Sequence, residues 1–241
     1  LKYSLIALLS PLAGGIVAAF LGKSMGKIFV NASTILGVTI SFTFSCMLAL
    51  DLYQTSTVFN QNLYTWIDIG AFTFHIGLLI DNLTVSMMVV VTFVSLMVHI
   101  YTIGYMRDDP GYHRFFAYIS LFTFSMLSLV MSNNFLQLFF GWEAVGVMSY
   151  LLIGFWYTKE SAIKANLKAF LVNRVGDLSL ILGIGIIFSI TGSLDYQIAF
   201  SETQSLTQTE FNLFNTWTIS ALTGACILLF GGAMGKSAQM P

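Results

Sequence analysis

The sequence has little charge. Only 9% of its 241 residues are Asp, Glu, Lys or Arg, whereas a soluble domain carries roughly 25% charged residues. Ten basic and eleven acidic side chains are too few to cover a soluble fold of this size. This composition excludes a soluble enzyme, a secreted disulfide scaffold and a disordered tail. The net charge of −1 also argues against a nucleic-acid-binding protein, which needs a basic face.

The sequence also lacks the motifs of metal and cofactor sites. Its two cysteines, Cys46 and Cys226, lie in apolar runs without CxxC or CxxH spacing, so neither a disulfide framework nor a zinc site is indicated. His75, His99 and His113 have no metal-ligand spacing. No P-loop, dinucleotide fingerprint or haem-attachment motif is found.

Long apolar runs fill most of the chain. Hydrophobic residues make up 56% of the sequence, and apolar runs of about 18 residues or more are typical of membrane-spanning helices. A secretory signal is disfavoured, because further spans follow at once and no cleavage site ends the first run. The predicted protein is therefore an all-α integral membrane protein. Its seven expected spans are residues 4–21, 28–50, 83–104, 115–131, 135–157, 163–190 and 213–241, the last one incomplete.

The basic residues of the predicted loops collect on one side of the membrane. Six of them fall on one side and only Lys2 falls on the other, where the loops are acidic. Because cytoplasmic loops are enriched in Lys and Arg, the side with six is predicted to be inside and the N-terminus outside. The six residues are Lys23, Lys27, Arg107, Arg114, Lys159 and Lys164.

Two segments outside the spans have a recognisable pattern. Leu63–Asp68 and Phe72–Ile80 are rich in aromatic and β-branched residues and flank Gly70, which predicts a small β-hairpin on the outer face. Ser201–Thr209 is polar and is predicted to be a flexible loop.

Glu143 is an acidic residue inside a predicted span. Counted from Phe135 at about 1.5 Å per residue, it lies roughly 12 Å below the outer boundary of a hydrocarbon core about 30 Å thick. Charged residues inside spans cost about 2.5–3.5 kcal/mol each and usually mark a function. Burial favours the protonated carboxyl and a nearby cation favours the ionised one, so Glu143 is a candidate for loading and releasing a proton. The alternative is a protonated, purely structural carboxylic acid.

The sixth span carries a polar stripe formed by Asn166, Asn173 and Asp177. Arg174 lies three residues before Asp177, within reach for an ion pair on the same helix face. Such a pair either fixes the helix against its neighbour or tunes Glu143 and relays protons.

Lys236 has two interpretations. A straight helix would carry it to the inner surface, where a lysine is expected. Gly231 and Gly235 instead suit close helix packing, and together with Pro241 they suit a helix that breaks within the membrane, as in transporters. Spacing alone does not decide between the two positions.

Four stretches resemble the distal antiporter-like subunit of respiratory complex I, which is chain L in bacteria and chain 5 in mitochondria. The resemblance is specific from Tyr105 onward and is one of pattern before that residue. By length the chain resembles an N-terminal fragment of that family. The matching stretches are Tyr105–Tyr118, Gly141–Trp156, Lys168–Asp177 and Gly235–Gln239.

The resemblance implies an antiporter-like helix bundle with a discontinuous seventh helix that lifts Lys236 to mid-membrane. It implies that Glu143 and Lys236 are the interacting pair of a proton path, supported by Asp177 and Arg174. The expected function is proton translocation driven by electron transfer from NADH to quinone in other subunits. No cofactor is expected in this chain; NADH, FMN, iron–sulfur clusters and quinone belong to those other subunits.

The implied partners are the other membrane subunits of complex I, including the neighbouring antiporter-like subunit, within a bacterial inner membrane or a mitochondrial inner membrane. One alternative is the large subunit of a multi-subunit monovalent cation/proton antiporter, which has the same buried pair. The other is a purely structural membrane subunit, which would leave Glu143, Asp177 and Lys236 unexplained.

Overall fold

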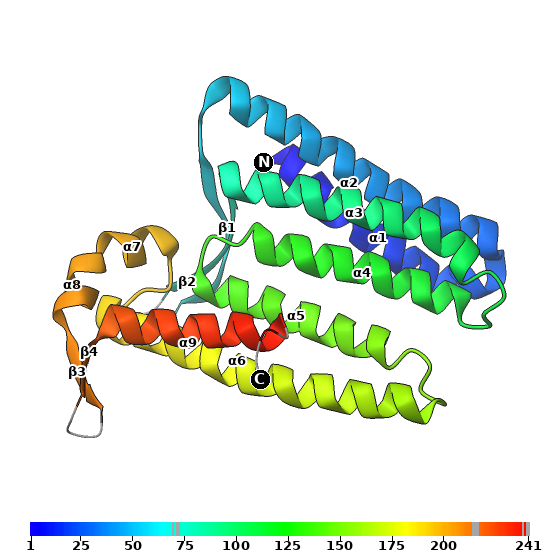
Figure 1. Cartoon of the computed structure of the whole chain (residues 1–241). Helices are drawn as coiled ribbons and strands as arrows, with labels where there is room; N and C mark the ends of the chain where they lie inside the picture. The colour runs from blue at the N-terminus through cyan, green and yellow to red at the C-terminus, as the bar shows by residue number, and fades with distance from the viewer. Residues whose placement is uncertain (69, 71–72, 214–216, 238, 240–241) are drawn as a thin grey trace.

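The computed structural model describes residues 1–68, 70, 73–213, 217–237 and 239 (Figure 1). Helices dominate, and two short antiparallel hairpins interrupt them. In chain order the elements are α1 (Lys2–Met25), α2 (Lys27–Thr55), β1 (Phe59–Asp68), β2 (Thr73–Ile80), α3 (Asn82–Tyr105), α4 (Tyr112–Val130), α5 (Phe135–Ile153), α6 (Glu160–Thr191), α7 (Tyr196–Ser201), α8 (Thr203–Gln208), β3 (Glu210–Leu213), β4 (Trp217–Ser220) and α9 (Ala221–Lys236).

Six helices in the described part of the chain, α1 to α6, are long and apolar enough to cross a membrane. They coincide with the first six predicted spans. Their ends follow local signals: the Asp81 carboxylate caps α3 by accepting from the Thr84 amide at 2.8 Å, and Asn134 caps α5 in the same way. Between α1 and α2, Gly26 has φ +86°, a conformation that strongly favours glycine. The all-α membrane class is confirmed.

The predicted outer hairpin is present as β1 and β2, which pair antiparallel from Phe59–Ile80 to Asp68–Thr73. It lies across the ends of α4 and α5 (Figure 1). The Gly77 amide donates to Gln137 Oε1 at 2.9 Å, and Asn134 Nδ2 donates to the His75 carbonyl at 2.9 Å. The hairpin is therefore fixed to the start of α5.

The three basic connections lie together at the opposite end of the bundle from this hairpin (Figure 1). The Lys27 ammonium donates to the Arg107 carbonyl, and Arg114 Nη2 donates to the Phe155 carbonyl at 3.4 Å. The grouping agrees with alternating crossings. The assignment of this end to the inner side of the membrane stays a prediction.

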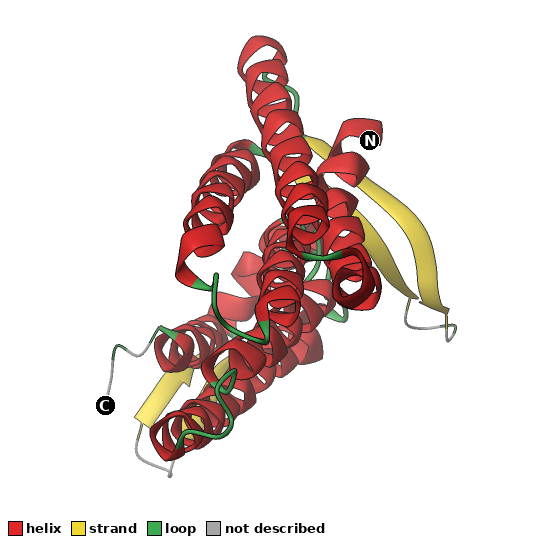
Figure 2. Ribbon diagram, turned by 90° about the vertical axis from the view of Figure 1, so that its right-hand side faces the viewer, coloured by secondary structure: helices red, strands yellow, loops and turns green. Residues whose placement is uncertain are grey.

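The region from 196 to 220 differs from expectation. Within the predicted loop Ser201–Thr209, Ser201 ends α7 and Thr203–Gln208 form α8. The Asp195 carboxylate caps α7 by accepting from the Gln197 amide at 2.9 Å. The seventh helix was expected from residue 213, but β3 and β4 occupy this stretch as a second hairpin. Helix α9 begins only after Ser220, whose hydroxyl caps it. Figure 2 places the two hairpins on different sides of the bundle.

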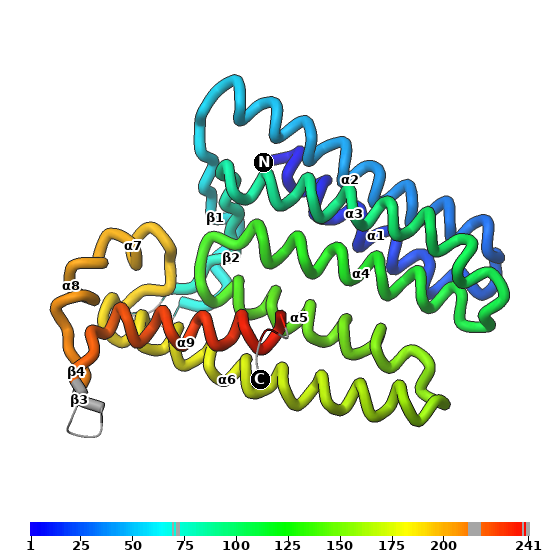
Figure 3. The backbone as a smooth tube through the Cα atoms, in the orientation of Figure 1, coloured from blue at the N-terminus to red at the C-terminus, as the bar shows by residue number. Residues whose placement is uncertain are grey.

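The described length of helix α9 is shorter than that of the six long helices. Its sixteen residues span about 24 Å, less than the hydrocarbon core of about 30 Å. It runs beside α6 and stops part-way along it (Figure 3). The helix ends at Lys236, with a turn at Ser237. Pro241, part of the predicted break, lies outside the described residues.

Glycines bring α9 and α6 close together. A Cβ at Gly232 would lie 2.8 Å from Leu180 Cβ, and a Cβ at Gly235 would lie 3.2 Å from Gly176 Cα. Side chains at these positions would push the helices apart, so the small residues set their separation. Ser179 Oγ also donates to the Leu228 carbonyl at 2.7 Å. The packing fixes how far along α6 the end of α9 lies.

Candidate functional site

Glu143 lies on α5, two turns after the capped start of the helix. Helix α5 packs closely on α4, because a Cβ at Gly141 would lie only 2.7 Å from Leu129 Cα. The Glu143 side chain points to the α6 side and is 23% exposed. The mid-membrane depth of Glu143 stays a prediction.

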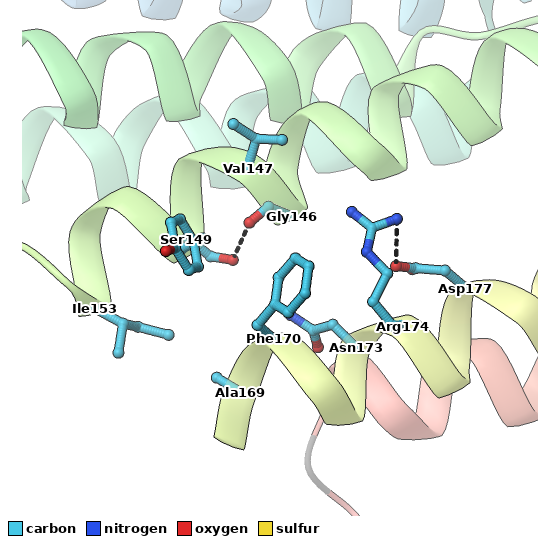
Figure 4. Close-up of a pocket in the computed structure, with 10 residues that line it drawn as sticks. Gly146, Val147, Ser149, Ile153, Ala169, Phe170, Asn173, Arg174 and Asp177 are labelled. Carbon is cyan, nitrogen blue, oxygen red and sulfur yellow. Dashed lines mark hydrogen bonds and ion pairs between the residues drawn. The ribbon is translucent and has the colours of Figure 1, made fainter. Parts of the chain in front are cut away.

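Arg174 on α6 contacts two carboxylates. Its Nη1 lies 3.0 Å from Glu143 Oε2 and 3.6 Å from Asp177 Oδ2. Figure 4 shows the guanidinium extending from α6 toward α5, with the Asp177 contact dashed. The Arg174–Asp177 contact expected from the three-residue spacing is present, but the shorter contact is with Glu143. One cation is therefore shared between an acid on its own helix and an acid on the neighbouring helix.

Lys236 reaches the same region from the end of α9. Its ammonium donates to the Trp142 carbonyl at 2.5 Å and lies 4.4 Å from the centre of the Trp142 ring, within range for a cation–π contact. The described residues contain no direct ion pair between Lys236 and Glu143. Lys236 therefore contacts Trp142, the residue before Glu143 in α5, and not the acid with which it was predicted to interact.

Trp142 connects the lysine to the second acid. Its indole Nε1 donates to Asp177 Oδ1 at 2.7 Å, so a single side chain contacts Lys236 with its ring and Asp177 with its N–H. Trp142 is not among the site residues predicted from the sequence. A tryptophan in an apolar run gives no signal of its own, and only the neighbouring Glu143 marks the segment.

The assembled cluster contains two acids and two bases. When all are ionised, Glu143, Asp177, Arg174 and Lys236 sum to zero charge, and Asp177, Glu143 and Arg174 are the charges that act on Lys236. A neutral group of ions is the arrangement that a low-dielectric interior tolerates best. Moving Arg174 by a few ångströms would leave Glu143 without the cation that it contacts. The arrangement is chemically suited to taking up and releasing one proton.

A small cavity lies beside the cluster between α5 and α6. Its volume is ≈ 80 Å³, and Asn173, Arg174 and Asp177 line it together with Ser149 and Phe170 (Figure 4). One water needs about 10–15 Å³ of such space, so the cavity has room for several. Two members of the predicted polar stripe, Asn173 and Asp177, line this cavity.

The histidines and potential metal ligands lie elsewhere. The buried His99 ring bonds to the Ser95 carbonyl at 2.7 Å and to Ser120 Oγ at 3.0 Å, which joins α3 to α4. In the described residues no three His, Cys, Asp or Glu side chains gather around a common point. The charged cluster on α5, α6 and α9 is therefore the candidate site.

Two family models match consecutive parts of the chain. Residues 66–116 match the model of NADH-ubiquinone oxidoreductase (complex I) chain 5 N-terminus, and residues 132–241 match the model of the NADH:quinone oxidoreductase/Mrp antiporter transmembrane region. The chain belongs to this family of antiporter-like membrane subunits. The second match contains the whole charged cluster, so the cluster lies in the part of the chain that defines the family.

Similar proteins carry names that agree with the two family models. NADH-quinone oxidoreductase subunit L of Neisseria meningitidis serogroup A is 53% identical over 242 residues, which cover 99% of this chain and 36% of the relative. NADH-ubiquinone oxidoreductase chain 5 of Chondrus crispus is 44% identical, with coverage of 98% and 35%. Subunit L of Rickettsia felis is 43% identical, with coverage of 98% and 36%. The chain spans about a third of the length of these relatives.

A solved structure has the same fold. A chain of the membrane-bound sulfane sulfur reductase, an archaeal respiratory membrane complex, superposes with a TM-score of 0.78 over 97% of this chain and 44% of that chain, at 14% identity. This likeness concerns the fold alone. The helical bundle is therefore shared between two sequences that have diverged widely.

Proposed function

We propose that this chain is part of a proton-translocating membrane subunit of NADH:quinone oxidoreductase. The observation that carries the proposal is the neutral cluster of two acids and two bases inside apolar helices, where a structural protein gains nothing from four charges. The names of the relatives, subunit L and chain 5, supply the complex in which the cluster works.

The working step is an exchange of cations at Glu143. In the arrangement described above, Arg174 neutralises Glu143, and Lys236 is held on Trp142. Rotation of Arg174 toward Asp177, which is already 3.6 Å away, leaves Glu143 without its cation, and the acid then takes up a proton. Approach of Lys236 to Glu143 favours the ionised carboxylate again and releases the proton.

The end of α9 allows Lys236 to move. The helix ends at this residue, so the lysine lies at a helix terminus rather than within a continuous hydrogen-bonded rod, as in the broken helices of transporters. A few ångströms separate its contact on Trp142 from the neighbouring Glu143. Electron transfer elsewhere in the complex would supply the energy that shifts this end.

The partners follow from the exposed part of the cluster. The Arg174 side chain is 47% exposed on the surface of this chain, although it lies within a predicted span. Charges in spans face protein or a water-filled cavity rather than lipid. This face therefore contacts further protein, in keeping with relatives about three times as long and with neighbouring membrane subunits. The redox cofactors are assigned to other subunits, in a bacterial or mitochondrial inner membrane.

A second candidate is a multi-subunit cation/proton antiporter, because the model that matches residues 132–241 describes Mrp antiporters as well. The match of residues 66–116 to complex I chain 5 and the named relatives favour the oxidoreductase. Sodium-dependent proton exchange without NADH oxidation, measured in vesicles, would support the antiporter instead.

The test is Glu143→Gln in the assembled oxidoreductase that contains this chain. The change keeps shape and hydrogen bonding but removes ionisation, so proton uptake into vesicles during NADH oxidation should fall sharply, while Glu143→Asp should keep part of it. Glu160→Gln is the matched control, since Glu160 forms an exposed ion pair with Lys164 outside the cluster. Normal uptake by a fully assembled Glu143→Gln complex would contradict the proposal.

A further inference from the structure

A second cavity lies between α5 and α6, nearer to the loop that joins them. Gly154, Tyr157 and Asn166 line it, and its volume is ≈ 410 Å³. We call it the loop-end cavity, and the one that contains Arg174 and Asp177 the cluster cavity. The loop-end cavity lies at the end of the bundle that carries the basic connections, on the predicted inner side.

Tyr150 and Phe170 are the residues shared by the two cavities. Tyr150 comes from α5 and Phe170 from α6, and their rings meet edge to face with centroids 5.7 Å apart. Such contacts between aromatic rings are stabilising and hold a preferred geometry. Tyr150 is 45% and Phe170 is 40% exposed on this chain. The pair therefore lies where the two cavities meet, on the face that the proposed function assigns to contact with further protein.

A buried polar atom of Asn166 in the loop-end cavity has no hydrogen-bond partner in the described protein. The Asn166 side chain is 9% exposed, and its Oδ1 has no hydrogen-bond partner among the described residues. Buried polar atoms in proteins are almost always hydrogen-bonded, often to an ordered water. Asn166 lines the loop-end cavity, so this cavity is a place for water.

Phe170 also touches the charged cluster. The Arg174 guanidinium lies 5.2 Å from the centre of the Phe170 ring, one turn along α6, and Figure 4 shows the ring between the two helices. The same ring thus contacts Tyr150 and Arg174. A rotation of Arg174 away from Glu143 would change its contact with the Phe170 ring.

We propose that Tyr150 and Phe170 form an aromatic gate that controls the passage of water from the loop-end cavity to the cluster cavity, and that Arg174 couples the gate to the charge state of the cluster. With Arg174 on Glu143 the rings are together and the water chain is interrupted. When Arg174 moves to Asp177, Phe170 is released, and water reaches Glu143 at the moment it can accept a proton. This inference rests on the proposed function and adds the step at which access of water to Glu143 is controlled.

The test measures water access on both sides of the gate. In the assembled complex, with Cys46 and Cys226 of this chain replaced by Ser, one reporter is Asn166→Cys in the loop-end cavity and the other is Asn173→Cys in the cluster cavity. A small, charged methanethiosulfonate is applied from the side of the α5–α6 loop, and mass spectrometry follows labelling of this chain. Cys at 166 should react quickly. The Asn173→Cys thiol should react at least about tenfold more slowly, which corresponds to a free-energy difference of about 1.4 kcal/mol in favour of the closed gate.

Phe170→Ala should raise the reaction rate at 173 close to the rate at 166, and Phe170→Leu should give an intermediate rate if the alanine variant assembles poorly. Phe93→Ala is the matched control, because Phe93 contacts Phe42 with the same centroid distance of 5.7 Å away from both cavities. Equal rates at 166 and 173 in the parent protein, or a rate at 173 that neither Phe170 variant changes, would overturn the gate.

The outcome is separable from that of the proposed function. Labelling reports access whether or not protons are pumped, whereas Glu143→Gln reports pumping with the gate unchanged. If the gate is correct, Phe170→Ala should also lower proton uptake per NADH oxidised, since an open water path lets protons leak back. A failed gate with a pump-deficient Glu143→Gln would leave the proposed function standing.

Discussion

The indole N–H of Trp142 is predicted to hold the cluster in its present arrangement, and Trp142→Phe removes it alone. Phenylalanine keeps an aromatic face under Lys236 and leaves the Trp142 backbone carbonyl unchanged, so both contacts of the lysine persist. The bond lost is the one to Asp177 Oδ1, which is 2.7 Å long. Asp177 then depends on Arg174, at 3.6 Å, for compensation.

The size of the effect follows from that bond. A hydrogen bond to a charged group contributes about 1.5–3 kcal/mol, which corresponds to a change of about 10- to 150-fold in the equilibrium between charge arrangements. Arg174 should shift from Glu143 to Asp177 to restore compensation there. Glu143 would then keep its proton for longer, and the rate of proton uptake should fall about tenfold or more.

The assay is the rate of proton uptake by vesicles during NADH oxidation, with assembly of the complex checked on native gels. Trp66→Phe is the control, because Trp66 lies on the β1–β2 hairpin and contacts Phe140 edge to face at 5.2 Å. Asp177→Asn added to Trp142→Phe should lower uptake little further, because the two residues share one interaction. A fully assembled Trp142→Phe complex with wild-type uptake, or losses that simply add, would refute the reasoning.

Three further predictions concern the cluster, the topology and the packing of α9. Arg174→Gln should impair assembly and pumping more than Asp177→Asn, because it leaves both carboxylates without their shared cation; equal losses would contradict the shared-cation arrangement. A cysteine at Lys159 should react with an impermeant maleimide only from the inner side, and labelling from the outer side would reverse the topology. Gly232→Ala should cost about 1–3 kcal/mol in free energy of unfolding through overpacking, because its Cβ would lie 2.8 Å from an α6 side-chain carbon. The melting temperature of the complex should therefore fall. Gly224→Ala, where the nearest atom is 3.9 Å away, should have little effect, and equal melting temperatures for the two variants would show that α9 has room to move.

The sequence alone was enough to predict the membrane class, the six long helices and the outer hairpin. Each depends on local composition, since an apolar run of sufficient length has no stable alternative to a spanning helix. It also singled out Glu143, Asp177 and Arg174, because a charge inside an apolar run is conspicuous without any structure. The place of Lys236 was open by spacing and was expected only from the family resemblance. The start of the seventh helix was misplaced, since Glu210–Leu213 and Trp217–Ser220 pair as strands and α9 begins only at Ala221.

Only the tertiary structure decided which charges meet. Spacing predicted the contact between Arg174 and Asp177 but could not reveal that Glu143, on another helix, lies closer to the same guanidinium. That contact depends on the relative positions of α5 and α6. Gly141 sets the close approach of α5 to α4, and Gly176 and Gly232 set the close approach of α6 to α9. The position of Trp142 between Lys236 and Asp177 likewise depends on how α5, α6 and α9 lie relative to one another. Interactions between helices are set by their relative positions, and a periodic pattern within one helix carries no record of the side chains that a second helix presents to it.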